Sequence, residues 1–270
     1  MTVPFENDTG NIVRKLARKS LKSEKRRNLM VVIAVALASC LICFSIVMAL
    51  STRQIEKNHV EDTYEAVYTR ITEEDVSTLK GLDDFSRVGE YYMLAVEPAE
   101  QGYNASYIYC DEETMYIARD QMKLLEGRLP QKEDEVVVSR YFLSNYAADA
   151  GIGEKVMLSS ESFHGEYTVT GIMEGYKEKE VNGSSILLSK EALKGWSGYD
   201  PADYRAYVHF KNEQQMDETE LTARSREIAK EYQLEMPIMN LSYMKFYKQP
   251  VNVSMLALVA GIAVLVIIGG

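Results

Sequence analysis

The sequence predicts an α+β domain held between two membrane-spanning helices. Two observations carry this prediction: uncharged apolar runs at residues 29–50 and 251–270, and a polar, acidic stretch at residues 51–250 between them. A third observation concerns the stretch itself, in which short apolar segments with strand-like alternation are interspersed with capped helical patterns. We therefore expect a mixed domain of short strands and helices.

The first apolar run meets the requirements of a transmembrane helix. Residues 29–50 hold no charge, and their only clearly polar members are Ser39 and Ser45. At about 1.5 Å per residue the run covers roughly 33 Å, enough to cross a hydrocarbon core of about 30 Å. A single crossing has to be helical, because every backbone amide must be paired internally in lipid. The run is also longer than the apolar region of a cleaved signal peptide, which is about 7–15 residues.

The second run, at residues 251–270, is uncharged as well, and Met255–Ile268 is its strongly apolar part. That part alone has the length at which a buried core helix competes with a span. We expect it to be the first part of a second transmembrane helix.

Charge predicts the orientation of the chain. Residues 1–28 hold eight basic and three acidic residues, a net charge of +5, and since the whole chain carries −10, the remainder carries −15. Basic residues close to a span stay in the cytoplasm, so we expect residues 1–28 on the cytoplasmic side of the cell membrane and residues 51–250 on its outer side. The eight basic residues predicted to set the topology and to lie at the membrane interface are Arg14, Lys15, Arg18, Lys19, Lys22, Lys25, Arg26 and Arg27.

The basic arm also has an amphipathic pattern. Ile12, Val13 and Leu16 recur at helical spacing with the cations mostly on other faces, as in a helix that lies in the interface beside anionic lipid headgroups. A solvated tail that serves only as a topology signal is the alternative. The same charges do not indicate nucleic-acid binding, because they adjoin a membrane span.

Local patterns predict the elements between the two runs. Ser51–Asn58 continues the first span as a helical stalk, and the chain returns to the membrane through Met236–Gln249. The expected strands are His59–Ile71 (with Tyr64 and Tyr68 on one face), Arg87–Val96, Ala105–Cys110, Val136–Val138, Lys155–Ser159, Glu166–Met173, Ser185–Leu188 and Tyr204–Phe210. The expected helices are Thr72–Lys80, Asp111–Arg119, Ser139–Ala148, a turn capped by Ser189, and Gln215–Tyr232.

Motifs for catalysis, metal binding or cofactor binding are missing from the sequence. His59, His164 and His209 are far apart, and none has a Cys or carboxylate at ligand spacing. Cys40 and Cys43 lie inside the first span, which leaves Cys110 without a disulfide partner in the outer domain. There is no nucleotide-binding fingerprint or phosphate-binding loop. We expect no enzyme activity, no metal and no cofactor in this chain.

Ser77-x-x-Lys80 and Ser242-x-x-Lys245 both fit the Ser-x-x-Lys pattern of penicillin-binding enzymes, but neither of the companion motifs of those enzymes is present. We interpret both matches as chance. The acidic clusters of the outer domain are interpreted as solvated faces.

Several segments, in order, resemble the FtsX/MacB-type permease family of ABC transporters. Residues 12–21, followed by Arg26, Arg27 and the first span, are similar to the family's amphipathic N-terminal helix and first transmembrane helix. Gly127-Arg128-Leu129-Pro130 followed by Glu135-Val136-Val137-Val138 resembles a family segment of the form GR-P…E-V-V. Gly151, Gly153 and the strand that contains Gly171 resemble the segment that comes next.

The resemblance implies a permease subunit with four transmembrane helices, a second permease copy, a separate cytoplasmic ABC ATPase and contact with membrane lipids. It further implies that ATP hydrolysis moves the outer domain, either to expel a peptide or lipid-like substrate or to regulate a partner. The motif residues expected to have structural roles are Gly127, Arg128, Pro130, Gly151, Gly153 and Gly171. A membrane-anchored sensor is the alternative, and a tethered hydrolase is a weaker one because a catalytic constellation is missing.

Overall fold

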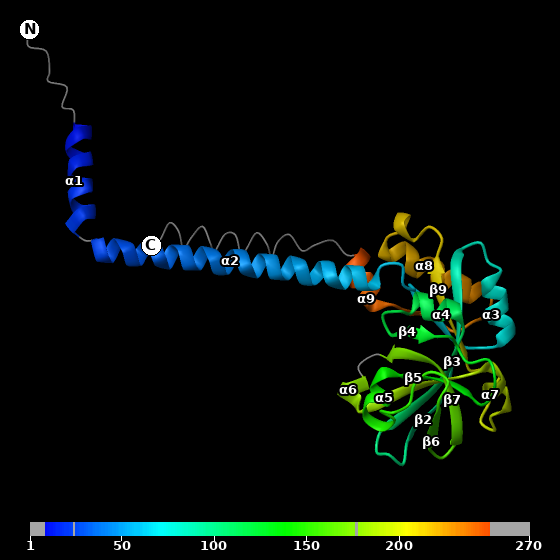
Figure 1. Ribbon diagram of the computed structural model, residues 1–270. Coiled ribbons are helices and arrows are strands. Elements are labelled where there is room, and N and C mark those ends of the chain that lie inside the picture. Colours follow the sequence, from blue (N-terminus) through cyan, green and yellow to red (C-terminus); the bar gives the residue numbers. More distant parts are fainter. Residues whose placement is uncertain (1–8, 24, 176–177, 249–270) are drawn as a thin grey trace, which may run out of the picture. The chain divides into compact units, whose positions relative to one another are not determined.

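The computed structural model describes residues 9–23, 25–175 and 178–248 (Figure 1). Residues up to Ile55 and residues from Glu56 to Gln249 belong to separate compact units. The predicted second span at residues 251–270 lies outside the described residues.

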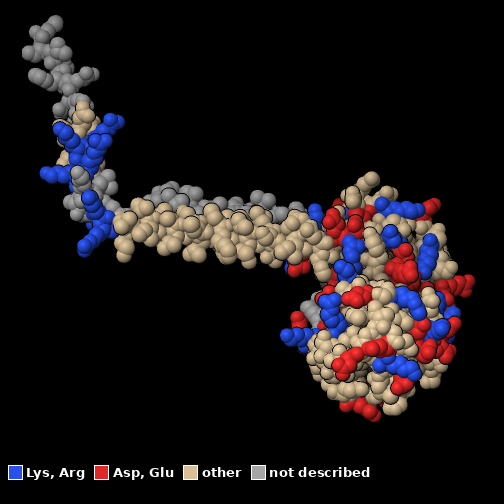
Figure 2. Space-filling model, in the orientation of Figure 1, with Lys and Arg blue, Asp and Glu red and all other residues tan. Residues whose placement is uncertain are grey.

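Two helices precede the domain, α1 (Thr9–Ser23) and α2 (Lys25–Val60). In the described part of the chain, α2 is the one helix long and apolar enough to cross a membrane. It continues through residues 51–58, which confirms the predicted helical stalk. Lys and Arg side chains gather over α1 and the first turn of α2, and the next part of α2 shows an uncharged surface (Figure 2). The basic arm is helical, with Ile12, Val13 and Leu16 exposed on α1, while its amphipathic role at the membrane interface stays a prediction.

The domain is built on a ten-stranded mixed sheet in the order β10-β1-β9-β2-β3-β8-β5-β7-β4, with β6 paired to β7. The β3–β8 and β5–β7 pairs are parallel, and the other pairs are antiparallel. The strands are β1 (Ala66–Ile71), β2 (Phe85–Pro98), β3 (Asn104–Cys110), β4 (Met122–Gly127), β5 (Glu135–Ser139), β6 (Lys155–Ser159), β7 (His164–Gly175), β8 (Gly183–Leu188), β9 (Tyr204–Phe210) and β10 (Ile238–Met239).

Short helices cover both faces of this sheet, which gives the predicted α+β fold. They are α3 (Glu73–Lys80), α4 (Glu112–Ile117), α5 (Arg140–Tyr146), α6 (Glu178–Val181), α7 (Lys190–Gly195), η1 (Glu213–Gln215), α8 (Glu218–Glu231), α9 (Leu241–Tyr243) and η2 (Met244–Lys248). Four of them begin at side-chain caps that the sequence indicated or allowed: Thr72, Asp111, Ser139 and Ser189 each accept a hydrogen bond from the third residue of the helix.

Two hydrophobic clusters pack on the two faces of the sheet. In β5, Val136 and Val138 belong to the larger cluster and Val137 to the smaller one, which explains the continuous apolar run of this strand. Helices α3, α5, α7 and α8 contribute to the larger cluster, and α4 contributes to the smaller one. Cys110 is buried in the smaller cluster as a free thiol, and burial raises its pKa.

Several local predictions were wrong. Residues 59–60 are the end of α2 rather than strand, and Tyr64 and Tyr68 belong to opposite clusters, because the chain turns before β1 begins at Ala66. The last predicted helix begins at Glu218, where Asp217 provides a capping box with Glu220. The strands β4 and β10 were not predicted. Residues 236–248 pack on the domain, where Tyr243 and Met244 are buried, and the predicted return to the membrane after them lies outside the described residues.

Candidate functional site at the C-terminal end of α2

The C-terminal end of α2 is fixed to the domain by its last turn. Val60 is buried in the core, and its carbonyl oxygen accepts hydrogen bonds from the amide and the hydroxyl of Thr63, the latter at 2.7 Å. The guanidinium of Arg119 donates to the carbonyl oxygens of Glu61 and Asp62. These bonds satisfy carbonyl groups that a helix end leaves unpaired, so the helix stops here and the chain turns into β1.

The last described segment of the chain returns to the same place. Asn240 donates from its amide nitrogen Nδ2 to the carbonyl oxygen of Tyr64 at 3.0 Å, and from its backbone to the carbonyl oxygen of Glu65 at 2.8 Å. Its Oδ1 accepts from the backbone amide of Tyr243 and caps α9. Asn240 therefore joins the segment that leaves the domain to the segment that follows α2.

Two further contacts strengthen this join. Strand β10 pairs with β1, with Ala66 opposite Met239. The ammonium group of Lys57, in the last turns of α2, lies 4.9 Å from the centre of the Tyr247 ring, a cation–π contact. We call residues 57–65, 209–213 and 240–248 together the junction.

Buried charges lie at the centre of the junction. The Lys248 side chain is only 7% exposed and pairs with Glu213, which is 6% exposed, through the carbonyl oxygen and the carboxylate of Glu213. A buried charge without its partner is costly, so each of these two residues depends on the other.

Glu65 and His209 form a second buried pair. Glu65 is fully buried, and its carboxylate lies 2.7 Å from Nδ1 of His209 and accepts from the backbone amide of Phe210 at 2.8 Å. Burial raises the pKa of Glu65, against the opposing effect of His209. Burial by itself lowers the pKa of His209, but the hydrogen bond and the charge of Glu65 outweigh it and raise that pKa. The pair therefore retains a proton to higher pH than free histidine does.

Among the described residues, one group brings potential metal ligands together: the ligand atoms of Asp62, His209 and Glu213 lie within 4.8 Å of one another. His209 uses Nδ1 to contact Glu65, and Glu213 is paired with Lys248. We interpret the group as part of the ion-pair network of the junction.

The motif residues of the sequence meet elsewhere, around β7. Gly127 has φ +80° and lies opposite Gly171 in the β4–β7 pair. A Cβ atom on Gly127 would come 2.2 Å from the carbonyl oxygen of Thr170, and a Cβ on Gly171 would come 2.8 Å from that of Arg128. The two strands can approach this closely only because both positions are glycine.

The Arg128 side chain closes the loop that follows Gly127. Its two terminal nitrogens donate to the two carboxylate oxygens of Glu135, each at 2.8 Å, and the backbone amide of Gln131 donates to the same carboxylate at 2.9 Å. The Arg128 hydrogen bonds lower the pKa of Glu135 to about 2. The family resemblance indicated Arg128 but did not indicate that its partner is Glu135, the first residue of β5.

The other predicted site residues have these positions. Gly153 has φ +89° and donates to the carbonyl oxygen of Val169, while the amide of Gly151 donates to the carboxylate of Glu154. Pro130 lies in the loop between β4 and β5. The eight basic residues lie in α1 and at the start of α2. The structure thus brings together Gly127, Arg128, Gly153 and Gly171, and the basic arm is a separate feature.

Comparisons with known proteins agree with this architecture. The sequence profile of the MacB-like periplasmic core domain family matches residues 29–226. A search of curated proteins found no match.

Three solved structures match part of this chain. The extracellular domain of the noncanonic ABC-type transporter YknZ from Gram-positive bacteria has 16% identity, covers 66% of this chain and 100% of its own, and has a TM-score of 0.46. The periplasmic region of MacB from Actinobacillus actinomycetemcomitans has 11% identity, covers 68% and 91%, and has a TM-score of 0.47. A domain of a putative permease from Porphyromonas gingivalis has 14% identity, covers 72% and 96%, and has a TM-score of 0.46.

The family profile spans most of the chain, from the start of the apolar helix through most of the mixed sheet. The chain therefore belongs to the FtsX/MacB-type permease family, and its folded unit is a MacB-like periplasmic core domain.

Proposed function

We propose that this chain is part of a permease subunit in an ABC transporter, in which a separate cytoplasmic ATPase moves the extracytoplasmic domain. Family membership supports the association with transport. The observation that carries the mechanical part is the junction: Asn240 joins the segment leaving the domain to the residues directly after α2.

The helix that leads into the junction is suited to transmit motion. No glycine or proline interrupts α2 between Leu29 and Val60, so its hydrogen bonding runs without a built-in kink from the apolar stretch to the domain. A tilt or rotation of the helix reaches Val60 and the buried network behind it. Because the returning segment is bonded to the same residues, it follows the same displacement, as in a hinge or shear movement.

In this proposal the chain itself carries out no catalysis. The charged groups of the junction serve to keep two chain segments together, and the work comes from ATP hydrolysis in a partner subunit. Two permease copies and two ATPase subunits would assemble in the membrane, and the moving domains would expel a peptide or lipid-like substrate or act on another protein.

The test is purification of the full-length protein from its native membrane in a nonionic detergent, followed by identification of bound subunits and measurement of ATP hydrolysis. We expect stoichiometric co-purification of an ABC ATPase with a phosphate-binding loop. A sensor would instead co-purify with a kinase or other signalling module, and that result, or no ATPase at all, would contradict the proposal.

A further inference from the structure

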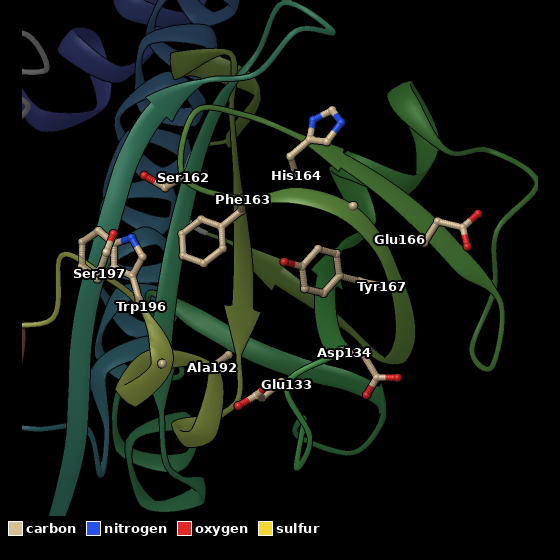
Figure 3. A pocket seen from close by; sticks show the side chains of 12 residues that line it. Glu133, Asp134, Ser162, Phe163, His164, Glu166, Tyr167, Ala192, Trp196 and Ser197 are labelled. Carbon is tan, nitrogen blue, oxygen red and sulfur yellow. The ribbon is translucent and has the colours of Figure 1, made fainter.

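A pocket of about 650 Å³ lies away from the junction, beside the β6–β7 hairpin. Its walls come from the turn and first residues of β7, from the loop before β5, and from the end of α7 and the residues after it. In the close-up view the rings of Phe163 and Tyr167 lie in its middle, Trp196 lies to one side of them, and the carboxylates of Glu133, Asp134 and Glu166 lie at its edge (Figure 3).

The aromatic wall is held in place by the fold. Phe163 is 6% exposed, and its ring packs against Tyr107, with 4.3 Å between ring centres, and against Trp196 at 6.2 Å in a stacked arrangement. The hydroxyl of Ser160 bonds to the hydroxyl of Tyr107 and to the carbonyl oxygen of Phe163, which fixes the turn. The wall is therefore formed before any ligand arrives, and binding requires little reordering.

The carboxylates that line this pocket are not matched by a lysine or arginine in its lining. Glu133, Asp134 and Glu166 are exposed acidic residues, and none of the twelve residues lining the pocket is a lysine or arginine. Lys155 pairs with Glu166 at 2.9 Å, whereas Glu133 and Asp134 have no ion-pair partner in the part of the chain that the structure describes. The faces of aromatic rings also carry negative potential, so wall and edge both favour a cation and disfavour an anion.

We propose that this pocket binds a soluble organic ammonium ion, a positively charged nitrogen that carries alkyl groups. The alkyl groups would contact the rings of Tyr167 and Trp196, and the charge would lie over these ring faces within reach of the carboxylates. A bare metal ion would gain little from the rings, and a neutral apolar molecule would gain nothing from the carboxylates. The inference does not depend on the proposed transport mechanism.

The chain offers a direct reporter, because Trp196 is its single tryptophan. The experiment titrates choline into the full-length chain in nonionic detergent and follows Trp196 emission, with 3,3-dimethylbutan-1-ol, the neutral molecule of the same shape, as the comparison. We expect a saturable change with choline that weakens as salt is added, and an affinity for the alcohol lower by roughly tenfold or more. Equal responses to the two molecules, or no response to choline, would overturn the proposal.

Variants assign the response to the proposed groups. Glu133→Gln and Asp134→Asn should each weaken choline binding roughly two- to fivefold, the size of a solvent-exposed charge interaction, and more when combined. Tyr167→Leu should weaken it by a similar factor through loss of a ring face, with circular dichroism to confirm folding. Glu180→Gln, an exposed acid outside the pocket, is the matched control and should leave binding unchanged.

A final arm separates a soluble ligand from a lipid headgroup. Phosphatidylcholine in mixed micelles presents the same ammonium group as free choline. Saturation by free choline supports the proposal, and a response to the phospholipid alone contradicts it. An undiminished response in the Glu133→Gln, Asp134→Asn double variant would also contradict it.

Discussion

Replacing Asn240 by alanine removes the side chain that joins the two segments at the junction. Asn240 is 6% exposed, and its side chain makes two hydrogen bonds, to the carbonyl oxygen of Tyr64 at 3.0 Å and from the amide of Tyr243 at 3.1 Å. Tyr64 and Tyr243 are themselves buried, so the variant leaves a buried acceptor and a buried donor without these partners. Each unpaired buried group costs about 1–3 kcal/mol, and we expect a total loss of about 2–4 kcal/mol in the free energy of unfolding.

The assay is equilibrium urea unfolding of the full-length chain in nonionic detergent, followed by Trp196 fluorescence. The matched control is Asn145→Ala, which removes a similar bond, from Asn145 to the carbonyl oxygen of Tyr141 at 2.7 Å, at an exposed position. We expect the control to change stability by less than about 0.5 kcal/mol. If Asn240→Ala were no more destabilising than Asn145→Ala, the join would not depend on this side chain and the reasoning would be refuted.

Three further predictions follow from the other contacts. Gly102 has φ +86° in open space, and Gly102→Ala should lower the free energy of unfolding by roughly 1 kcal/mol through backbone strain. Gly127→Ala or Gly171→Ala should lower it by well over that amount, because a Cβ atom there meets backbone atoms. Equal losses in urea unfolding would contradict this. The pKa of Glu135 is lowered from 4.5 to about 2, so its contribution to stability is present above pH 4.5 and is lost as the pH falls toward 2. Arg128→Ala should therefore make the free energy of unfolding less dependent on pH over that range. The pKa of His209 is raised above 6.5, so its contribution to stability is complete below pH 6.5 and is lost as the pH rises through the raised pKa. His209→Gln should remove this decline in the free energy of unfolding. An unchanged decline would assign it to another group.

Much of the fold could be predicted from local patterns. Alternating residues placed β9 correctly, since Tyr204, Ala206, Val208 and Phe210 all belong to the larger cluster. Capping residues gave the starts of α3, α5 and α7, because a cap is set by residues within one turn of the helix. These elements were predictable because their causes are close together in sequence.

The errors come from contacts between distant residues. Strand β10 has only two residues, and it exists because residues 66–67 of β1 lie beside it, so the segment itself carries no strand signal. The contact of His209 with Glu65 spans 144 residues, and Asn240 reaches Tyr64 across 176 residues. Neither side chain has a motif around it, and the junction was therefore not visible in the sequence.

The family motif was informative in a different way. It indicated Gly127, Arg128 and Gly171 as structural residues without showing that two of them face each other across β4 and β7. Strand β4 was missed because the consecutive Leu124 and Leu125 break the alternation, and the bulge in its pairing with β7 shifts the register. The steric reason for the motif became apparent only once these two strands were placed side by side.

The central claim is that the extracytoplasmic domain moves when the partner ATPase binds nucleotide. The most direct measurement places a spin label at the exposed position 180 through Glu180→Cys, with Cys40→Ala and Cys43→Ala, in the proposed complex of two permease copies. The distance between the two labels is then compared without nucleotide and with a non-hydrolysable ATP analogue. We predict a shifted distance distribution that is reduced when Asn240→Ala loosens the junction. Identical distributions in the two nucleotide states would contradict the account.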